Sequence, residues 1–208
     1  HVLLYPIYNQ ILISITLNMD SKNTLETLEN VRESISFYLS EGVKNRKSDF
    51  RTFTLCTSTD KPAGRTVVLR GYNRENGIIT VHSNFHAEKV TEINKNSNAC
   101  CVFYSKAKKI QIRCFGRAEV NHNNDKSSSA WSNMSDMSKE CYFQKPYPGN
   151  VINNYDSFSK NVIDRESDSF VVINIHIEKI DWLYLKREGH RRANIFINQV
   201  SKDTWVSP

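Results

Sequence analysis

The stretch GRTVVLRG (64–71) places two arginines, Arg65 and Arg70, around an apolar run that is typical of a buried strand. A guanidinium group is a planar fork of donors that matches the oxygens of a phosphate or a carboxylate. Residues five apart in a strand point to opposite faces, so the two arginines are predicted to serve different groups unless a bulge intervenes. The alternative is that both lie at strand ends in surface ion pairs.

A second set of polar side chains follows in VHSNFHAEKV (81–90). Ser83 ends a predicted strand, and Lys89 falls one turn into a predicted helix. The free N–H groups of a helix N-terminus, a hydroxyl and a lysine can converge on one anion. Gln111 and Arg113 lie two apart in QIRCFG, so they share one face of their strand and predict a polar group beside it.

The basic residues are concentrated in the part of the chain that holds these motifs. Residues 61–120 contain eleven Lys or Arg against four Asp or Glu, whereas the rest of the chain holds 17 against 18. Such a block predicts an anionic partner, either a phosphorylated small molecule or a nucleic acid. The simpler interpretation, a solvated turn, fits Lys106, Lys108 and Lys109.

The five cysteines form no disulfide or metal-binding pattern. They are odd in number and include no C-x-x-C pair, so they indicate buried free thiols in a reducing compartment, the cytoplasm. No metal site is expected, because the histidines show no metal-ligand spacing with an acidic residue. This holds for His82, His86 and His190.

Hydrophobic periodicity predicts a mainly β protein with peripheral helices. Apolar residues at spacings of three and four predict an amphipathic helix over about 24–43. Short connections between the predicted strands favour an antiparallel barrel or sandwich of about seven or eight strands over a doubly wound sheet. Strands are predicted at 50–58, 65–71, 77–83, 99–105, 109–120, 169–177, 180–185 and 192–199. Further helices are predicted at 86–96, with Asn84 as N-cap, and at 126–143, with Trp131, Met134 and Met137 packed in the core.

The first 18 residues are apolar and precede a methionine, Met19. They lack the basic start and the small-residue cleavage site of a signal peptide. Pro6, Asn9 and Gln10 interrupt the run, which argues against a membrane anchor. We expect an apolar extension over 1–18 and a single domain over 19–208, with a natural start at Met19 or upstream of it.

Three segments, RTVVLRG (65–71), HSNFHAEK (82–89) and QIRCFGRAE (111–119), resemble the FMN-binding split barrel of the pyridoxamine 5'-phosphate oxidase family in order and spacing. The segments NRKSDFRTFTLCTS (45–58), GHRR (189–192) and DTWVSP (203–208) are similar to its single-domain FMN-binding branch. The resemblance extends over about 45–208 and is most specific over 61–120.

The resemblance implies an antiparallel split barrel of six to eight strands, and a homodimer that binds FMN in a cleft shared by both subunits. It also implies hydride transfer from pyridoxamine or pyridoxine phosphate to the flavin, which oxygen then reoxidises. Gln111 would address the flavin ring, and the catalytic residues would be Arg70, near the flavin and the substrate phosphate, and Arg191, near the reacting carbon. Arg65, Ser83 and Lys89 would hold the cofactor phosphate. The full set expected to line the FMN site is Arg65, Thr66, Val67, Val68, Leu69, Arg70, His82, Ser83, Lys89 and Gln111.

This sequence departs from the family pattern at two places. Glu88 stands where the family's oxidases have an arginine beside Lys89. In the segment that holds the substrate phosphate, Met134 takes the arginine position and Ser138 remains. A phosphate that loses such a charge-assisted contact loses about 1.5 to 3 kcal/mol. The expected substrate-binding residues are therefore Arg70, Ser138 and Arg191.

Three functions are consistent with these residues. The first is an FMN-dependent oxidoreductase of this family that acts on a phosphorylated small molecule. The second is an FMN-binding protein without vitamin B6 oxidase activity, such as a flavin reductase, carrier or sensor, which the change at Met134 favours. The third is a nucleic-acid-binding β-barrel, which needs exposed aromatics among the basic residues. Its only candidates, Phe103 and Tyr104, have apolar neighbours that suit a core, so neither a nucleic-acid partner nor a membrane partner is expected.

Overall fold

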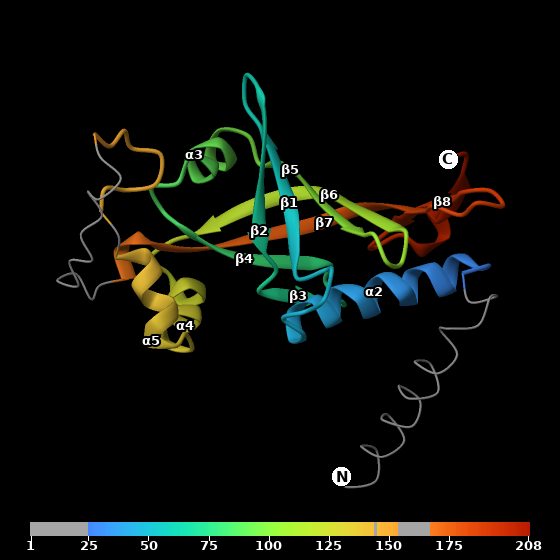
Figure 1. Cartoon of the computed structure of the whole chain (residues 1–208), viewed down its shortest axis with the longest axis horizontal. Helices are drawn as coiled ribbons and strands as arrows, with labels where there is room; N and C mark the ends of the chain where they lie inside the picture. Colours follow the sequence, from blue (N-terminus) through green and yellow to red (C-terminus); the bar gives the residue numbers. More distant parts are fainter. Residues whose placement is uncertain (1–24, 144, 154–166) are drawn as a thin grey trace, which may run out of the picture.

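Nine antiparallel strands form one sheet in the part of the chain that the computed structural model describes, residues 25–143, 145–153 and 167–208 (Figure 1). The strand order is β2-β1-β5-β6-β7-β4-β3, with β8 on β7 and β9 on β8. The predicted mainly β architecture is confirmed, whereas the expectations for 1–18 and Met19 lie outside the described residues. The strands are β1 (Thr52–Ser58), β2 (Pro62–Val68), β3 (Gly71–Asn73), β4 (Ile78–Asn84), β5 (Asn98–Ser105), β6 (Ile110–Asn121), β7 (Phe170–Tyr184), β8 (Arg191–Phe196) and β9 (Thr204–Val206).

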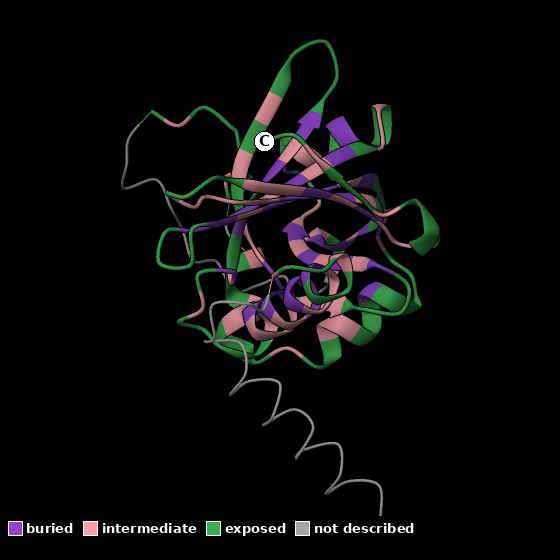
Figure 2. Ribbon diagram, turned by 90° about the vertical axis from the view of Figure 1, so that its right-hand side faces the viewer, coloured by how far each residue is buried: buried purple, intermediate pink, exposed green. Residues whose placement is uncertain are grey.

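Alternation along the strands gives the sheet two faces, which we call inner and outer. Figure 2 shows buried and more exposed stretches interleaved along the ribbon. The inner-face side chains are buried in one core cluster, which includes Phe53 and Leu55 of β1 and Cys101 and Phe103 of β5. Side chains at the intervening positions of both strands are exposed or half-buried. A strand with this pattern presents one face to the core and leaves the other available for contacts.

Helix α2 (Leu28–Lys44) lies along the sheet and closes the core (Figure 1). Thr27 caps its N-terminus by accepting a hydrogen bond from the backbone N–H of Asn30, and buried Val31, Ile35 and Leu39 recur every four residues. The predicted helix over about 24–43 is therefore confirmed, with a later start. The shorter helix α3 (Glu88–Lys95) contributes Val90 and Ile93 to the same core.

Strand β7 is the longest element of the sheet and pairs with three others. Its first half pairs with β4, its second half pairs with β8, and β6 pairs with it along both halves. A bulge interrupts the pairing with β6, because Gly116 lies opposite Ile177 and Phe115 lies opposite Lys179, which leaves Glu178 as the extra residue. The positions predicted as two strands, 169–177 and 180–185, are thus one strand with a bulge.

The segment predicted as one helix over 126–143 is broken into α4 (Asp125–Ser132), α5 (Asp136–Lys139) and a 3-10 helix (Glu140–Tyr142). Asn124 caps α4 with its side chain, and serine and asparagine at 132, 133 and 135 favour turns over helix interiors. Trp131 does pack against Phe170. Met137 is 81% exposed, so the prediction that it belongs to the core is wrong.

Three local predictions are also wrong. Asn84 is not the N-cap of α3: its side chain accepts from the backbone N–H of His86 in a turn before the helix, and the cap position is Ala87. Tyr104 is 49% exposed on the outer face instead of lying in the core. All five cysteines are free, but Cys141 is exposed rather than buried.

None of the described helices is both long and apolar enough to cross a membrane.

Candidate functional site

Arg65 projects from the inner face of β2 toward helix α3. Its Nη2 donates to Glu92 Oε2 at 2.6 Å, and its Nη1 donates to the hydroxyl of Thr57. The Thr57 hydroxyl in turn donates to Glu92 Oε2 at 2.5 Å. Glu92 is only 8% exposed, so its carboxylate is a buried charge that Arg65 and Thr57 stabilise. Of the two alternatives for Arg65, an ion pair is present, but it is partly buried rather than on the surface.

Lys89, one turn into α3, completes a group of cations around Arg65. Its Nζ donates to Ser83 Oγ at 3.1 Å, and Ser83 is buried at the end of β4. The pKa of Lys89 is lowered, first by burial and then by the nearby charge of Arg65, while Glu92 opposes that shift. The structure therefore brings Arg65, Ser83 and Lys89 together, and we call these three residues the cation cluster.

The residues between Arg65 and Arg70 differ in where they point. Thr66 is exposed on the outer face, and Val67 and Val68 are half-buried. Leu69 is fully buried in the core, and its backbone N–H and C=O both bond to Arg51. Leu69 thus anchors the chain after β2 to Arg51, and its side chain belongs to the core.

Arg70 lies past the end of β2, where its backbone N–H donates to Thr80 O. It is exposed, and its guanidinium group has no hydrogen bond or ion pair to any described residue. Burial, and next the charge of Arg70, lower the pKa of His82 to about 4. Burial raises the pKa of Tyr142, and the charge of Arg70 opposes that shift. The bond to Thr80 places Arg70 two residues from His82 along β4, and His82 and Tyr142 both pack against Phe170.

His82 holds an unpaired polar atom in this neighbourhood. Its Nδ1 is buried and has no hydrogen-bond partner among the described residues, while its ring packs edge-on against Phe170 at 5.0 Å. Tyr142 packs edge-on against the same Phe170 ring at 5.0 Å. Sequence reasoning did not identify Tyr142 or Glu92. An acidic residue one helical turn after Lys89 was the available signal for Glu92.

Gln111 and Arg191 lie elsewhere, and we call them the distal pair. Gln111 is half-buried on the outer face of β6, opposite Leu183 of β7. Arg191 begins β8 opposite Tyr184, and its guanidinium group contacts Leu25 O at 3.3 Å and Glu26 Oε1 at 3.7 Å.

The distal pair is separated from the cation cluster by most of the length of β7. Ser83 pairs with Val171, whereas the distal pair lies beside Leu183 and Tyr184. At about 3.3 Å per residue, this separation is roughly 40 Å along the strand. Figure 1 shows α3 and β8 at different ends of the sheet. One copy of the chain therefore does not bring all the predicted site residues together.

A charged group lies beside Gln111 on the outer face. The Asp181 side chain is buried and accepts from Arg113 Nη2 at 2.5 Å and from Arg192 Nη2 at 2.7 Å. These two arginines keep the pKa of Asp181 below its usual value against the opposing effect of burial. The predicted shared face of Gln111 and Arg113 is confirmed, and Arg192 is a residue that sequence reasoning missed in GHRR.

Ser138 lies in α5, and its hydrogen bonds are to a residue of the same segment. Its hydroxyl lies 3.0 Å from that of Ser135, and its backbone N–H donates to Ser135 O. No hydrogen bond connects it to the cation cluster within the part of the chain that the structure describes. The described residues also contain no cluster of three or more potential metal ligands.

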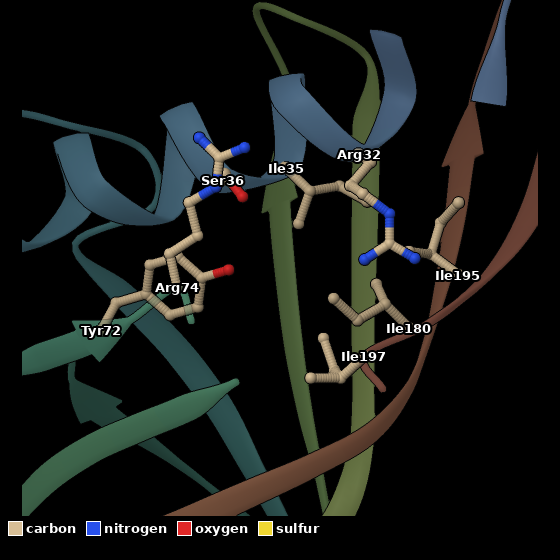
Figure 3. A pocket seen from close by; sticks show the side chains of 8 residues that line it. All are labelled: Arg32, Ile35, Ser36, Tyr72, Arg74, Ile180, Ile195 and Ile197. Atoms are coloured by element: carbon tan, nitrogen blue, oxygen red, sulfur yellow. The ribbon is translucent and has the colours of Figure 1, made fainter. Parts of the chain in front are cut away.

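A separate cavity lies between α2, β3 and β8 (Figure 3). Its volume is about 50 Å³, enough for one or two water molecules but far too small for a nucleotide-sized ligand. It contains none of the predicted site residues. Arg32 in its wall is paired with Asp203 at 2.7 Å, and burial raises the pKa of Tyr72.

Comparisons with known proteins agree with this fold. Residues 32–122 match the family model described as pyridoxamine 5'-phosphate oxidase, FMN-binding domain. The chain is 24% identical over 145 residues to a pyridoxine/pyridoxamine 5'-phosphate oxidase of Coxiella burnetii. That match covers 68% of this chain and 66% of the relative, which is just under two thirds of the relative's length.

Two solved structures have a similar fold. A pyridoxamine 5'-phosphate oxidase-related, FMN-binding protein of Nostoc punctiforme has a TM-score of 0.69 at 20% identity, over 85% of this chain and 97% of that one. PhzG from Burkholderia lata, in complex with tetrahydrophenazine-1-carboxylic acid, has a TM-score of 0.70 at 13% identity, over 85% and 91%. At these identities the likeness establishes the fold alone, a split barrel.

Proposed function

Residues 32–122 belong to the pyridoxamine 5'-phosphate oxidase FMN-binding domain family, and from this premise we propose that the chain binds FMN and catalyses a flavin-dependent oxidation. The observation that carries the proposal is the close placement of two partly buried cations, Arg65 and Lys89, beside the Ser83 hydroxyl. Like charges held together repel, and a phosphate dianion between them relieves that repulsion. The donor set therefore fits the phosphate of FMN.

The residues near Arg70 fit a ligand that extends from that phosphate. Arg70 has a free guanidinium group, and His82 has a buried ring nitrogen without a partner among the described residues. Bound flavin would accept a hydride from the substrate and pass the electrons to oxygen. Arg70 would hold the substrate's anionic group and orient its reacting carbon, and neutral His82 would accept or donate one hydrogen bond without adding charge.

We propose that two copies of the chain form the complete site. Gln111 and Arg191 lie roughly 40 Å along β7 from the cation cluster, so they reach a flavin on that cluster only from a second subunit. A two-fold homodimer brings the distal pair of each subunit to the cation cluster of the other. In this arrangement Gln111 contacts the flavin ring and Arg191 contacts the substrate. We also propose that 19–208 is one domain, because α2, α3 and the strands share one core.

A phosphorylated substrate has less support than the cofactor. Met134 stands where the family places an arginine, and the Ser138 hydroxyl bonds to Ser135. We therefore keep as a second function FMN binding without pyridoxamine 5'-phosphate oxidase activity, as in a flavin reductase, carrier or sensor. This chain would then use Arg70 for another anionic group, such as a carboxylate.

The first experiment measures flavin in the purified full chain. We expect a yellow protein whose flavin absorption survives desalting, or a colourless one that regains the absorption after incubation with FMN. Hydrogen peroxide released on adding pyridoxamine 5'-phosphate supports the oxidase, whereas bound FMN without peroxide supports the second function. A colourless protein that cannot be reconstituted contradicts both.

Variants then test the phosphate contacts. Lys89→Ala is expected to weaken FMN affinity by about tenfold or more, because one charge-assisted contact is worth about 1.5 to 3 kcal/mol. Arg65→Met is combined with Glu92→Gln so that no unpaired carboxylate stays buried, and it is expected to act in the same direction. Lys95→Ala, an exposed lysine of the same helix, is the control. Unchanged affinity in both site variants would refute the phosphate assignment.

A further inference from the structure

Two cysteines lie directly opposite each other on neighbouring strands. Cys56 of β1 pairs with Cys100 of β5 in the register of the sheet, and both are free and half-exposed. Opposed residues of an antiparallel pair point to the same face, with Cα atoms about 4.5 to 5.5 Å apart. A disulfide needs a Cα separation of about 4.4 to 6.8 Å, so the backbone already holds the two residues at a bonding distance.

The surroundings of the pair leave one sulfur open. Gly64 lies opposite Cys56 on β2, and a side-chain carbon built at Gly64 would lie 3.9 Å from the Cys56 sulfur. The missing side chain therefore uncovers that side of Cys56. The pKa of Cys100 is raised to about 11, mainly by burial and then by Cys56, while Arg113 opposes the shift. Cys56 is thus the better placed of the two to react first.

A second cysteine pair has the same register but a different environment. Cys101 of β5 lies opposite Cys114 of β6, on the inner face of the sheet. Both are 0% exposed, and burial raises the pKa of each thiol. An oxidant in solvent cannot reach them in the folded chain, so they form an internal control with matched geometry.

We propose that Cys56 and Cys100 form a dithiol site that a hydroperoxide converts into a cross-strand disulfide. The Cys56 thiolate attacks hydrogen peroxide, the O–O bond breaks, and Cys56 becomes a sulfenic acid as one water is released. The Cys100 sulfur then attacks the Cys56 sulfur, the S–O bond breaks, and a second water leaves. The two thiols lose two electrons and two protons, and one hydrogen peroxide becomes two waters.

The disulfide would join β1 to β5 on the outer face, near Arg113. It links two strands that are already paired, so it requires no rearrangement of the sheet. It also closes a loop of the chain between residues 56 and 100, which restricts the unfolded state and raises the Tm of the oxidised protein. A thiol reductant restores both thiols.

The experiment exposes the full chain to hydrogen peroxide, alkylates the remaining thiols, and maps the peptides without reduction. Cys141 is exposed and reports that the oxidant has acted. We expect one intrachain cross-link, between Cys56 and Cys100, with Cys101 and Cys114 alkylated only after denaturation. The expected Tm shift is upward and is reversed by dithiothreitol.

Variants separate this result from other outcomes. Cys56→Ser and Cys100→Ser should each abolish the cross-link and the Tm shift, and Cys141→Ser should keep both. Fully oxidised Cys141 beside unlinked Cys56 and Cys100 would overturn the proposal. A cross-link between Cys101 and Cys114 under native conditions would overturn it too, because burial would then not determine which pair reacts.

Discussion

Glu92 sets the charge that the cation cluster presents to an anion. Its carboxylate accepts from Arg65 at 2.6 Å and from Thr57 at 2.5 Å, and it also opposes the lowering of the Lys89 pKa that burial and Arg65 cause. The same group that fixes the guanidinium group of Arg65 would therefore compete with the proposed phosphate for it. In the proposed site, Glu92 would favour stability at the expense of ligand affinity.

The variant Glu92→Gln tests that conflict. An amide oxygen still accepts from Arg65, but the negative charge is lost, so FMN affinity is expected to rise by about two- to fivefold. The free energy of unfolding is expected to fall by about 1 to 3 kcal/mol, because a hydrogen bond to a charged group becomes neutral. Flavin titration and urea unfolding measure the two effects. Glu75→Gln, at an exposed carboxylate between β3 and β4, should change neither by a comparable amount.

His82 predicts how stability depends on pH. Burial, and next Arg70, lower its pKa from 6.5 to about 4 in the folded chain. The unfolded chain therefore takes up a proton near pH 6.5, whereas the folded chain resists it until about pH 4. Stability from this group is complete above pH 6.5 and is lost as the pH falls toward 4.

Urea unfolding at pH 7 and pH 5 measures this loss. His82→Gln should flatten the change between the two pH values, and His190→Gln, at an exposed histidine, should leave it as in the unchanged chain. An equally steep change in His82→Gln would show that other groups cause it.

Sequence reasoning placed the cation cluster well because spacing is informative there. Ser83 ends a strand and Lys89 starts the next helix, and a short turn forces the two together. Alternation along one strand predicted that Arg70 and Arg65 point to opposite faces and so serve different groups. The strand ends at Val68, so the two arginines are separated because Arg70 lies in the segment after the strand. Tyr142 was not found, because its approach to His82 depends on how a broken helical segment folds over Phe170.

At the scale of elements, the bulge between β6 and β7 leaves no room for a side chain at Gly116. A Cβ there would lie 1.9 Å from the His176 carbonyl oxygen and 2.9 Å from the Cα of Ile177. Both obstacles are backbone atoms of the central strand, which cannot move without disturbing the hydrogen bonds on each side.

Gly116→Ala is therefore expected to lower the free energy of unfolding by about 3 kcal/mol or more. Gly64→Ala is the matched control, because its nearest contact would be an ordinary 3.4 Å from Thr54, and its effect should stay within about 0.5 kcal/mol. Urea unfolding of both variants measures the two free energies. Similar values for the two would mean that the strands open easily at the bulge.

Most strands were predictable because alternation of buried and exposed residues is local. The same alternation failed at β7, where the polar pair Glu178 and Lys179 reads as a break between strands and is in fact a bulge. The three-residue strands β3 and β9 were missed, because pairing partners far along the chain define them. Met137 was wrongly predicted to be buried, because the helical spacing of apolar residues continues in the sequence beyond Ser132, where α4 ends.

At the scale of the whole molecule, the proposed division of the site between two subunits makes a quantitative prediction. Lys89→Ala removes part of the cation cluster, and the double variant Gln111→Ala, Arg191→Ala removes the distal pair. Each variant alone forms homodimers in which both sites are defective. In a mixed dimer one site collects both defects and the other is complete.

Equal amounts of the two variants, unfolded together and refolded, should therefore recover about a quarter of the FMN sites of the unchanged protein, since half of the dimers are mixed. Flavin retained after desalting measures the recovery, and each variant refolded alone gives the baseline. Retention no higher than the baseline would mean that the site lies within one subunit or that no dimer forms.

The bulge in β7 also changes which residues of the strand face the core. Before the bulge the odd-numbered residues Ile173, Ile175 and Ile177 face inward, and after it the even-numbered Ile180 and Trp182 do. The extra residue, Glu178, causes this change. Deleting Glu178 would leave a regular ladder with every later side chain on its present face. What would change is the bend of the strand, and with it the direction in which Gln111 and Arg191 point. In the proposed homodimer, a change in chain length at this position would therefore alter how the two subunits meet more than it alters the core of either one.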